Sequence, residues 1–194
     1  MSSSTPDHIS RRALALGLAA GAALPGLAWA EDRDTYTEPE IIEAAGRFFG
    51  ETAEGLADVV RHIFHDQGSP NGYIQGDEGS GAIGVGLRYG NGYMHLHHLP
   101  NTTRVFWQGP SVGFDTGGNG SKVFTLIYHM RSASQIFNRY PGVDGSAYFV
   151  GGVGANYQRR NGIVLAPIRA GIGFRLGASV GYLHYSRRRR VNPF

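Results

Sequence analysis

Four charged side chains are candidates for binding an anion because each stands among glycines on one face of an expected strand. They are Arg88, Asp115, Arg169 and Arg175. Successive side chains of a strand point to opposite faces, and most residues of the same parity as these four are glycine. A guanidinium without bulky neighbours can hold a carboxylate or phosphate through two parallel hydrogen bonds. The pattern favours a cleft for an anionic lipid head group or a glycan phosphate.

The same residues allow a second interpretation, in which the arginines are paired inside the protein. Buried arginines are usually paired with a carboxylate. The partners that the sequence offers are Asp115 and an acidic helix near the N-terminus. Glycine would then serve to admit the helix backbone. Both interpretations stay open at this point.

Trp107 is a further ligand-binding candidate. In the segment from Val105 to Gln108, alternation places Trp107 beside Val105 and puts Phe106 on the other face. The indole could form a wall for a ligand, or it could be a core aromatic whose N–H is hydrogen-bonded. Tyr89, Tyr148 and Tyr182 present the same choice.

The sequence offers little for catalysis or metal binding. His95 and His97 share a strand face, but no acidic residue lies near them and the chain has no cysteine. A structural zinc takes four ligands, so we expect no metal site. Motifs for a phosphate loop or a metalloprotease are missing from the chain. We therefore expect no cofactor, no catalytic residues and no enzyme activity; a buried, strongly shifted carboxylate in a cleft would favour an enzyme instead.

The first thirty residues predict an export signal. Arg11 and Arg12 precede an apolar run, residues 13–27, and Ala28-Trp29-Ala30 follows as a cleavage site. The run is shorter than the roughly 20 strongly apolar residues of a membrane span, although a retained anchor is an alternative. The paired arginines also fit a twin-arginine signal, so both export routes stay open. We expect a periplasmic protein.

The net charge of +3 conceals two oppositely charged parts. Residues 31–78 hold three Lys or Arg against twelve Asp or Glu, whereas residues 79–194 hold thirteen against two. An exported chain with an acidic segment and no RNA-binding signature is not expected to bind nucleic acid. The run from Arg187 to Arg190 is interpreted as a solvated tail or as a peripheral contact with an anionic membrane surface.

One long amphipathic helix is predicted over residues 38–65, after a linker at residues 31–36. Thr37 and Glu40 have the spacing of a capping box, and Gly68 is a plausible terminator. Apolar residues recur every three or four positions, which gives the helix one apolar stripe and otherwise polar faces. Such a helix should lie against the outside of a sheet.

The remaining chain predicts strands near residues 73–76, 80–89, 93–98, 103–115, 122–129, 146–157, 161–169 and 171–185. Asn91-Gly92 and Asn161-Gly162 are expected to be two-residue hairpin turns, and residues 132–140 a short helix or irregular crossing. Alternating antiparallel strands favour a small soluble antiparallel β-barrel over residues 73–185, because closure removes exposed edges. The expected organisation is one mainly β domain over residues 37–194, with a basic tail at 186–194. The alternative is an integral outer-membrane barrel of eight strands.

Several motifs carry a family resemblance that spans most of residues 38–194. They include Pro70-Asn71-Gly72-Tyr73-Ile74, Leu87-Arg88-Tyr89-Gly90, Trp107-Gln108-Gly109-Pro110-Ser111-x-Gly113-Phe114-Asp115 and Pro167-Ile168-Arg169-x-Gly171-x-Gly173-x-Arg175. The chain resembles the EipA family of alphaproteobacterial envelope-integrity proteins, and more weakly the SYLF lipid-binding domain. The resemblance to EipA implies a soluble periplasmic β-barrel that supports envelope integrity without established catalysis. The cluster of His95, His97 and His98 and the terminal arginine run depart from the family, so no family role is carried onto them.

Overall fold

Two short helices stand where the sequence pattern predicts one long helix. The computed structural model describes residues 34–50, 55–81, 85–112, 120–143, 146–170 and 181–189. Helix α1 is Glu38–Phe49 and helix α2 is Leu56–Gln67. Gly50 and Gly55 between them have φ values of +92° and +82°, outside the right-handed helical region. The prediction of a continuous helix over residues 38–65 is therefore wrong.

The predicted ends of this helical region are confirmed. Thr37 donates from its backbone N–H to a Glu40 carboxylate oxygen at 2.7 Å, which completes the capping box of α1. Helix α2 ends at Gly68, whose φ is +78° and whose N–H donates to the Phe64 carbonyl at 2.8 Å.

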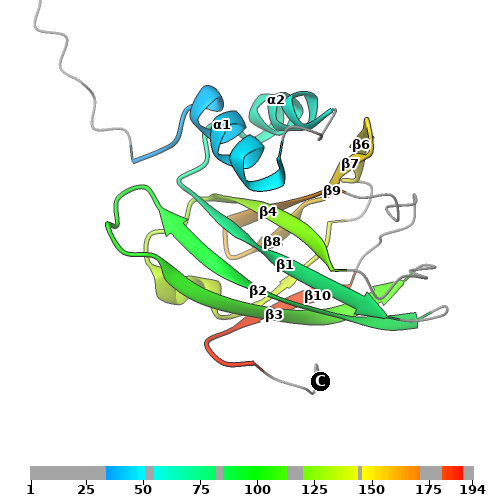
Figure 1. Cartoon of the computed structure of the whole chain (residues 1–194). Helices are drawn as coiled ribbons and strands as arrows, with labels where there is room; N and C mark the ends of the chain where they lie inside the picture. The colour runs from blue at the N-terminus through cyan, green and yellow to red at the C-terminus, as the bar shows by residue number, and fades with distance from the viewer. Residues whose placement is uncertain are drawn as a thin grey trace, which may run out of the picture. The chain divides into compact units, whose positions relative to one another are not determined.

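Ten antiparallel strands within the described residues form one sheet in the order β5-β10-β3-β2-β1-β4-β9-β7-β6, and β8 pairs with the first part of β9 (Figure 1). A short 3₁₀ helix, η1, covers Ala133–Ile136 between β4 and β5. The strands are β1 Gly72–Gly81, β2 Val85–Leu96, β3 Thr103–Val112, β4 Ser121–Tyr128, β5 Arg139–Pro141, β6 Tyr148–Val150, β7 Val153–Ala155, β8 Gln158–Arg160, β9 Ile163–Ala170 and β10 Tyr182–Ser186.

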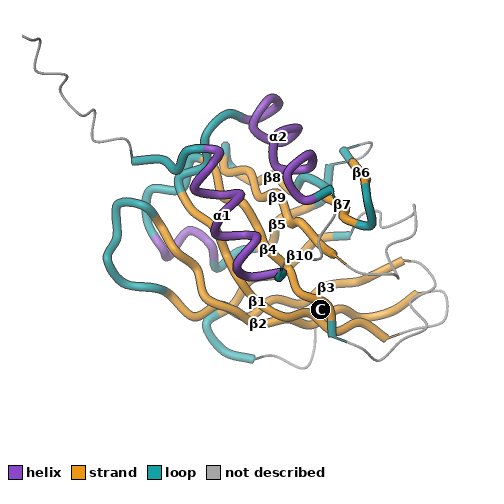
Figure 2. The backbone as a smooth tube through the Cα atoms, turned by 45° about the horizontal axis from the view of Figure 1, so that its top comes forward, coloured by secondary structure: helices purple, strands orange, loops and turns teal. Residues whose placement is uncertain are grey.

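The sheet curls into a half-barrel, as the tube in Figure 2 shows. The expected barrel is thus confirmed in its mainly β, antiparallel and curved character. One contact between the edges is a bridge from Gly142, just after β5, to Gln158 of β8. Beside it, the Val143 N–H donates to the Tyr157 carbonyl at 2.8 Å.

One predicted hairpin turn is confirmed and the other is wrong. Asn161 and Gly162 have φ values of +49° and +81° and join β8 to β9, as a type I′ turn requires. Asn91 and Gly92 instead lie inside the continuous strand β2. A Cβ at Gly92 would lie 2.2 Å from the Gln75 carbonyl oxygen of β1, so this glycine serves a close approach between strands. The strand predicted over residues 146–157 is interrupted at Gly151-Gly152, between β6 and β7.

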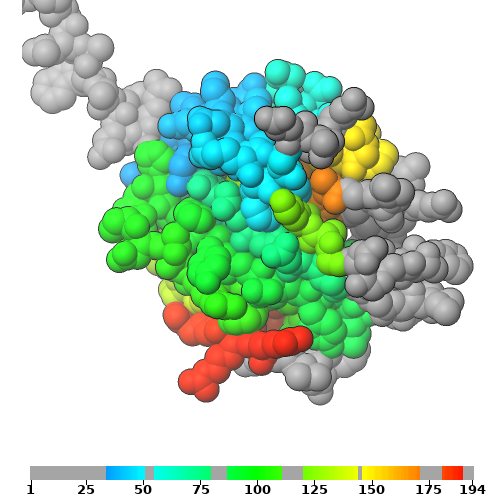
Figure 3. Space-filling model, viewed as in Figure 1, coloured from blue at the N-terminus to red at the C-terminus, as the bar shows by residue number. Residues whose placement is uncertain are grey.

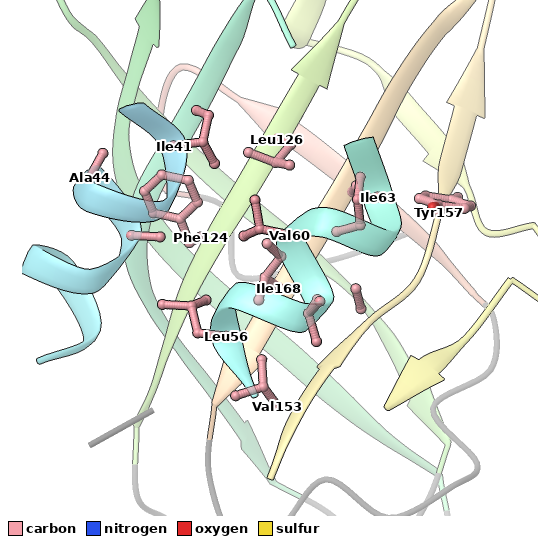
Figure 4. Packing of buried hydrophobic residues seen from close by; sticks show 14 of the residues in the cluster. Ile41, Ala44, Leu56, Val60, Ile63, Phe124, Leu126, Val153, Tyr157 and Ile168 are labelled. Atoms are coloured by element: carbon pink, nitrogen blue, oxygen red, sulfur yellow. The ribbon is translucent and has the colours of Figure 1, made fainter. Parts of the chain in front are cut away.

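Two hydrophobic clusters occupy the two faces of the sheet. Helices α1 and α2 pack on the outer face of β4, β7 and β9, which confirms that the helical region lies outside the sheet (Figure 4). Along β4, Phe124 and Leu126 contact the helices, whereas Val123 and Ile127 belong to the inner cluster. The inner cluster also contains Trp107, as well as Ile74, Met94, Val105, Ile136, Tyr140, Leu165, Leu183 and Tyr185. Neither α1 nor α2, nor any other helix in the described ranges, has the length and apolarity needed to cross a membrane.

Candidate functional site

A buried charged group lies on the inner face of the half-barrel, centred on Glu78 of β1. The Glu78 side chain is 4% exposed. Arg169 of β9 donates from Nε to Oε1 at 3.0 Å and from a terminal nitrogen to Oε2 at 3.4 Å. Trp107 of β3 donates from Nε1 to Oε2 at 2.8 Å, and Arg88 Nε of β2 lies 3.1 Å from Oε1. We call Glu78, Arg88, Trp107 and Arg169 the Glu78 cluster.

Strand register places the members of the cluster on one face. Glu78 is opposite Gly90 in the β1–β2 ladder, and Gly90 is opposite Trp107 in the β2–β3 ladder. Residues directly opposite each other in an antiparallel ladder project to the same side. A carboxylate, a glycine and an indole therefore form one row across three strands.

The glycines beside this row make room for the indole. A Cβ at Gly90 would lie 2.1 Å from Trp107 Cε2, and one at Gly76 would lie 2.7 Å from Trp107 Cη2. Real Cβ atoms do not approach other atoms this closely, so the indole can lie across β1 and β2 only because these positions lack side chains. Gly76 and Gly90 therefore leave the space that the Trp107 indole occupies.

The environment keeps Glu78 ionised. Burial alone would raise the pKa of its carboxyl group, but the guanidiniums of Arg169 and Arg88 outweigh burial and hold that pKa below its ordinary value. Donation by Trp107 acts in the same direction. A buried carboxylate held in this way contributes stability only with its partners in place, since removing one partner leaves an uncompensated charge.

The two arginines of the cluster differ in exposure. The side chain of Arg169 is 3% exposed and also donates to Asn156 Oδ1 at 3.1 Å, so it is enclosed by protein groups. The side chain of Arg88 is 16% exposed and lies where the cluster meets the surface. Counted over the described residues, the cluster holds two positive guanidiniums and one negative carboxylate, so its charges sum to one positive.

Three of the five predicted ligand-binding residues, Arg88, Trp107 and Arg169, are brought together here. Asp115 and Arg175 lie outside the described residues. Trp107 is 3% exposed with its N–H bonded, as expected for a core aromatic.

The carboxylate that holds Arg169 is Glu78, which sequence reasoning missed. For this arginine the hypothesis of an acidic helix as partner is wrong, because the helices lie on the opposite face of the sheet. The signal lay in strand parity: Glu78 lies on the same face of β1 as Ile74 and Gly76, so it is the charged residue of β1 that points inward, whereas Asp77 points outward.

The histidine cluster takes part in aromatic packing. His95 stacks on Tyr73 with ring centroids 4.7 Å apart, and burial lowers the pKa of its imidazole. His97 packs edge-on against Tyr36, also at 4.7 Å. Across the described ranges, no three His, Cys, Asp or Glu side chains gather closely enough to hold a metal ion.

A curled antiparallel sheet with two helices on its outer face and an ion-paired cluster on its inner face defines a barrel-like β protein. A crystal structure described as a beta-barrel-like, uncharacterized protein from Brucella abortus is similar, with 48% identity and a TM-score of 0.75 over 83% of this chain and 99% of that one. The chain belongs to the Envelope integrity protein A (EipA) family, whose sequence profile matches residues 34–194. A search of the curated proteins gives no match.

Proposed function

We propose that this chain is a non-enzymatic periplasmic protein that supports the integrity of the cell envelope by binding the anionic group of a lipid or glycan at the Glu78 cluster. The observation that carries the proposal is the partial exposure of Arg88 at the margin of an otherwise buried cluster. A guanidinium has five N–H donors in a fixed plane, and the exposed 16% of the Arg88 side chain is the part of the cluster that an anion can reach.

Glu78 and Trp107 define the geometry of this site. Glu78 lies within ion-pair distance of Arg88, 3.1 Å from its Nε, and the buried Trp107 holds the Glu78 carboxylate in place through its N–H at 2.8 Å. A pre-positioned guanidinium loses less side-chain entropy on binding a phosphate than a freely rotating one.

The state of Glu78 supports binding rather than acid–base catalysis. Its carboxylate accepts hydrogen bonds from Arg169 and Trp107, and its lowered pKa leaves it no proton to donate at neutral pH. The neighbouring Asp77 is exposed and lies on the other face of β1, so the two carboxylates do not face each other.

Three observations support a soluble periplasmic location. The family takes its name from envelope integrity, and the sequence predicts an export signal in residues 1–30. In addition, α1 and α2 cover the outer faces of β4, β7 and β9, which in a membrane-spanning barrel would contact lipid. Release by osmotic shock without detergent is the expected result, and a requirement for detergent would refute this location.

Binding is tested with two probes that share the phosphate chemistry: phosphatidylglycerol vesicles, and phosphorylated oligosaccharides released from lipopolysaccharide. Arg88→Gln removes the charge but keeps a hydrogen-bonding side chain, and Arg104→Gln on the outer face of β3 is the matched control. We expect binding to at least one probe, weakened by about tenfold in Arg88→Gln, as loss of a charged hydrogen bond implies, and unchanged in Arg104→Gln. Absence of binding to both probes, or binding of both probes by the Arg88 variant as strong as that of the wild type, would refute the proposal.

A further inference from the structure

Three exposed arginines gather on the surface where β5, β8 and the segment after β10 meet. Arg160 donates from a terminal nitrogen to the Arg139 carbonyl at 3.3 Å. The Arg139 guanidinium lies over the Tyr182 ring at 5.0 Å, and that of Arg187 lies over the Phe137 ring at 4.2 Å. We call Arg139, Arg160 and Arg187 the arginine patch.

The arginine patch is distinct from the Glu78 cluster. Arg160 pairs with Ile163 at the beginning of β9, whereas Arg169 lies near the end of that strand. Six residues of extended chain separate these positions, a distance of roughly 20 Å. The patch also lies on the outside of the molecule, while the Glu78 cluster lies on the inner face.

The charges of the described residues are separated in space. Every described Asp or Glu belongs to residues 34–78, and five of these eight carboxylates lie on α1 and α2. Strands β5, β8 and β10 contain no acidic residue. In Figure 3 the helices occupy the top of the molecule and residues 182–189, in red, the bottom. An anionic surface would therefore attract the side that carries residues 182–189 and repel the side that carries the helices.

The aromatic partners give the patch the chemistry of a membrane interface. Stacking on Phe137 and Tyr182 orients the Arg187 and Arg139 guanidiniums, which remain exposed to solvent. Arginine and tyrosine both place an apolar portion beside a polar tip, which suits the head-group layer. No carboxylate of the described residues lies within the patch, and all three of its arginines are exposed, as contact with anionic head groups requires.

We propose that the arginine patch docks the protein peripherally onto an anionic phospholipid membrane, with α1 and α2 facing away. This contact is independent of the binding proposed for the Glu78 cluster. Each arginine near such a surface contributes about fivefold in affinity, so three predict a loss of roughly a hundredfold when all are neutralised. The attraction should also weaken as salt screens it.

The test is co-sedimentation with vesicles that contain both phosphatidylglycerol and phosphatidylcholine. Vesicles of pure phosphatidylcholine, which carry no net charge, are the comparison. The patch variant is Arg139→Gln, Arg160→Gln and Arg187→Gln combined. The matched control, Arg47→Gln, Arg61→Gln and Arg104→Gln combined, removes the same charge from other exposed positions. A third variant, Arg→Lys at the three patch positions, keeps the charge.

We expect salt-sensitive binding to the anionic vesicles only, lost in the patch variant and retained in the control and in the lysine variant. Failure of the wild-type protein to bind, or equal loss in the patch variant and the control, would overturn the proposal. Arg88→Gln separates the two sites: if that variant alone abolishes vesicle binding, the contact belongs to the Glu78 cluster and the patch proposal is wrong.

Discussion

Replacing Gly90 by alanine should destabilise the protein, because the added methyl group would overlap the Trp107 indole. An ideal Cβ at Gly90 lies 2.1 Å from Trp107 Cε2, 2.3 Å from Nε1 and 2.4 Å from Cζ2. Contact between carbon atoms is favourable near 3.5–4.0 Å, so the ring or the strand must move by more than 1 Å. The indole cannot move freely, since its N–H is held by Glu78 at 2.8 Å.

The expected cost has two parts. Forcing an extra carbon into a well-packed core costs about 1–3 kcal/mol. If the indole moves away, its hydrogen bond to a charged acceptor is lost as well, which costs about 1.5–3 kcal/mol. We therefore expect a decrease of about 3 kcal/mol in the free energy of unfolding, equivalent to about 6–12 °C in melting temperature for a chain of this size.

The assay is urea unfolding followed by far-ultraviolet circular dichroism. Gly79→Ala is the matched control, because a Cβ at that position of β1 meets nothing within 4 Å; its effect should stay within about 1 kcal/mol. In a Trp107→Phe background, Gly90→Ala should cost at least about 1 kcal/mol less than in the wild type. Equal effects of the two alanine substitutions, or strict additivity with Trp107→Phe, would refute the placement of the indole over Gly90.

Three further predictions concern the charged cluster and the helices. Glu78→Gln should lower the free energy of unfolding by about 3–5 kcal/mol at pH 7. Because the folded-state pKa of Glu78 is lowered, the stabilisation that its carboxylate gives is lost as pH falls through that pKa. The urea midpoints of wild type and variant should therefore converge in acid. Tyr157→Phe removes the 2.9 Å hydrogen bond that the Tyr157 hydroxyl donates to Asp66 Oδ2 and that lowers the pKa of Asp66. We expect the free energy of unfolding to fall by about 1 kcal/mol at pH 7. A difference between variant and wild type that does not change with pH would contradict this prediction. Gly55→Ala should destabilise, since φ is +82° and a Cβ would meet the Val150 carbonyl oxygen at 2.4 Å, whereas Gly46→Ala in α1 should stabilise by up to about 1 kcal/mol; thermal melts showing the same sign for both would contradict this account.

Local patterns predicted the strand content and the outward position of the helices, because alternation and helical periodicity report which face is buried. They failed at Gly50 and Gly55, where the spacing of apolar residues continues past two glycines whose left-handed backbone ends one helix and starts the next. They failed again at Asn91-Gly92. Gly92 is glycine because β1 approaches it closely, and the sequence does not distinguish such a glycine from one that a turn requires.

The candidate site was predictable in its cations but not in its anion. Arg88 and Arg169 stand out among glycines, whereas Glu78 lies in a polar, acidic stretch and gives no local sign that two arginines and an indole from three other strands meet it. Such a pairing depends on register, with Glu78 opposite Gly90 and Gly90 opposite Trp107, and periodicity fixes parity but leaves register open.

The place of β10 in the sheet has a consequence for how the chain is made. This strand, Tyr182–Ser186, is the last that the structure describes, yet it lies between β5 and β3 in the interior of the strand order. During synthesis from the N-terminus, β10 emerges after both β3 and β5. Until then, the edges of β3 and β5 that pair with β10 stay unpaired. The wall therefore cannot be completed before β10 has emerged, and a ribosome or export channel that holds back β10 also holds back the fold.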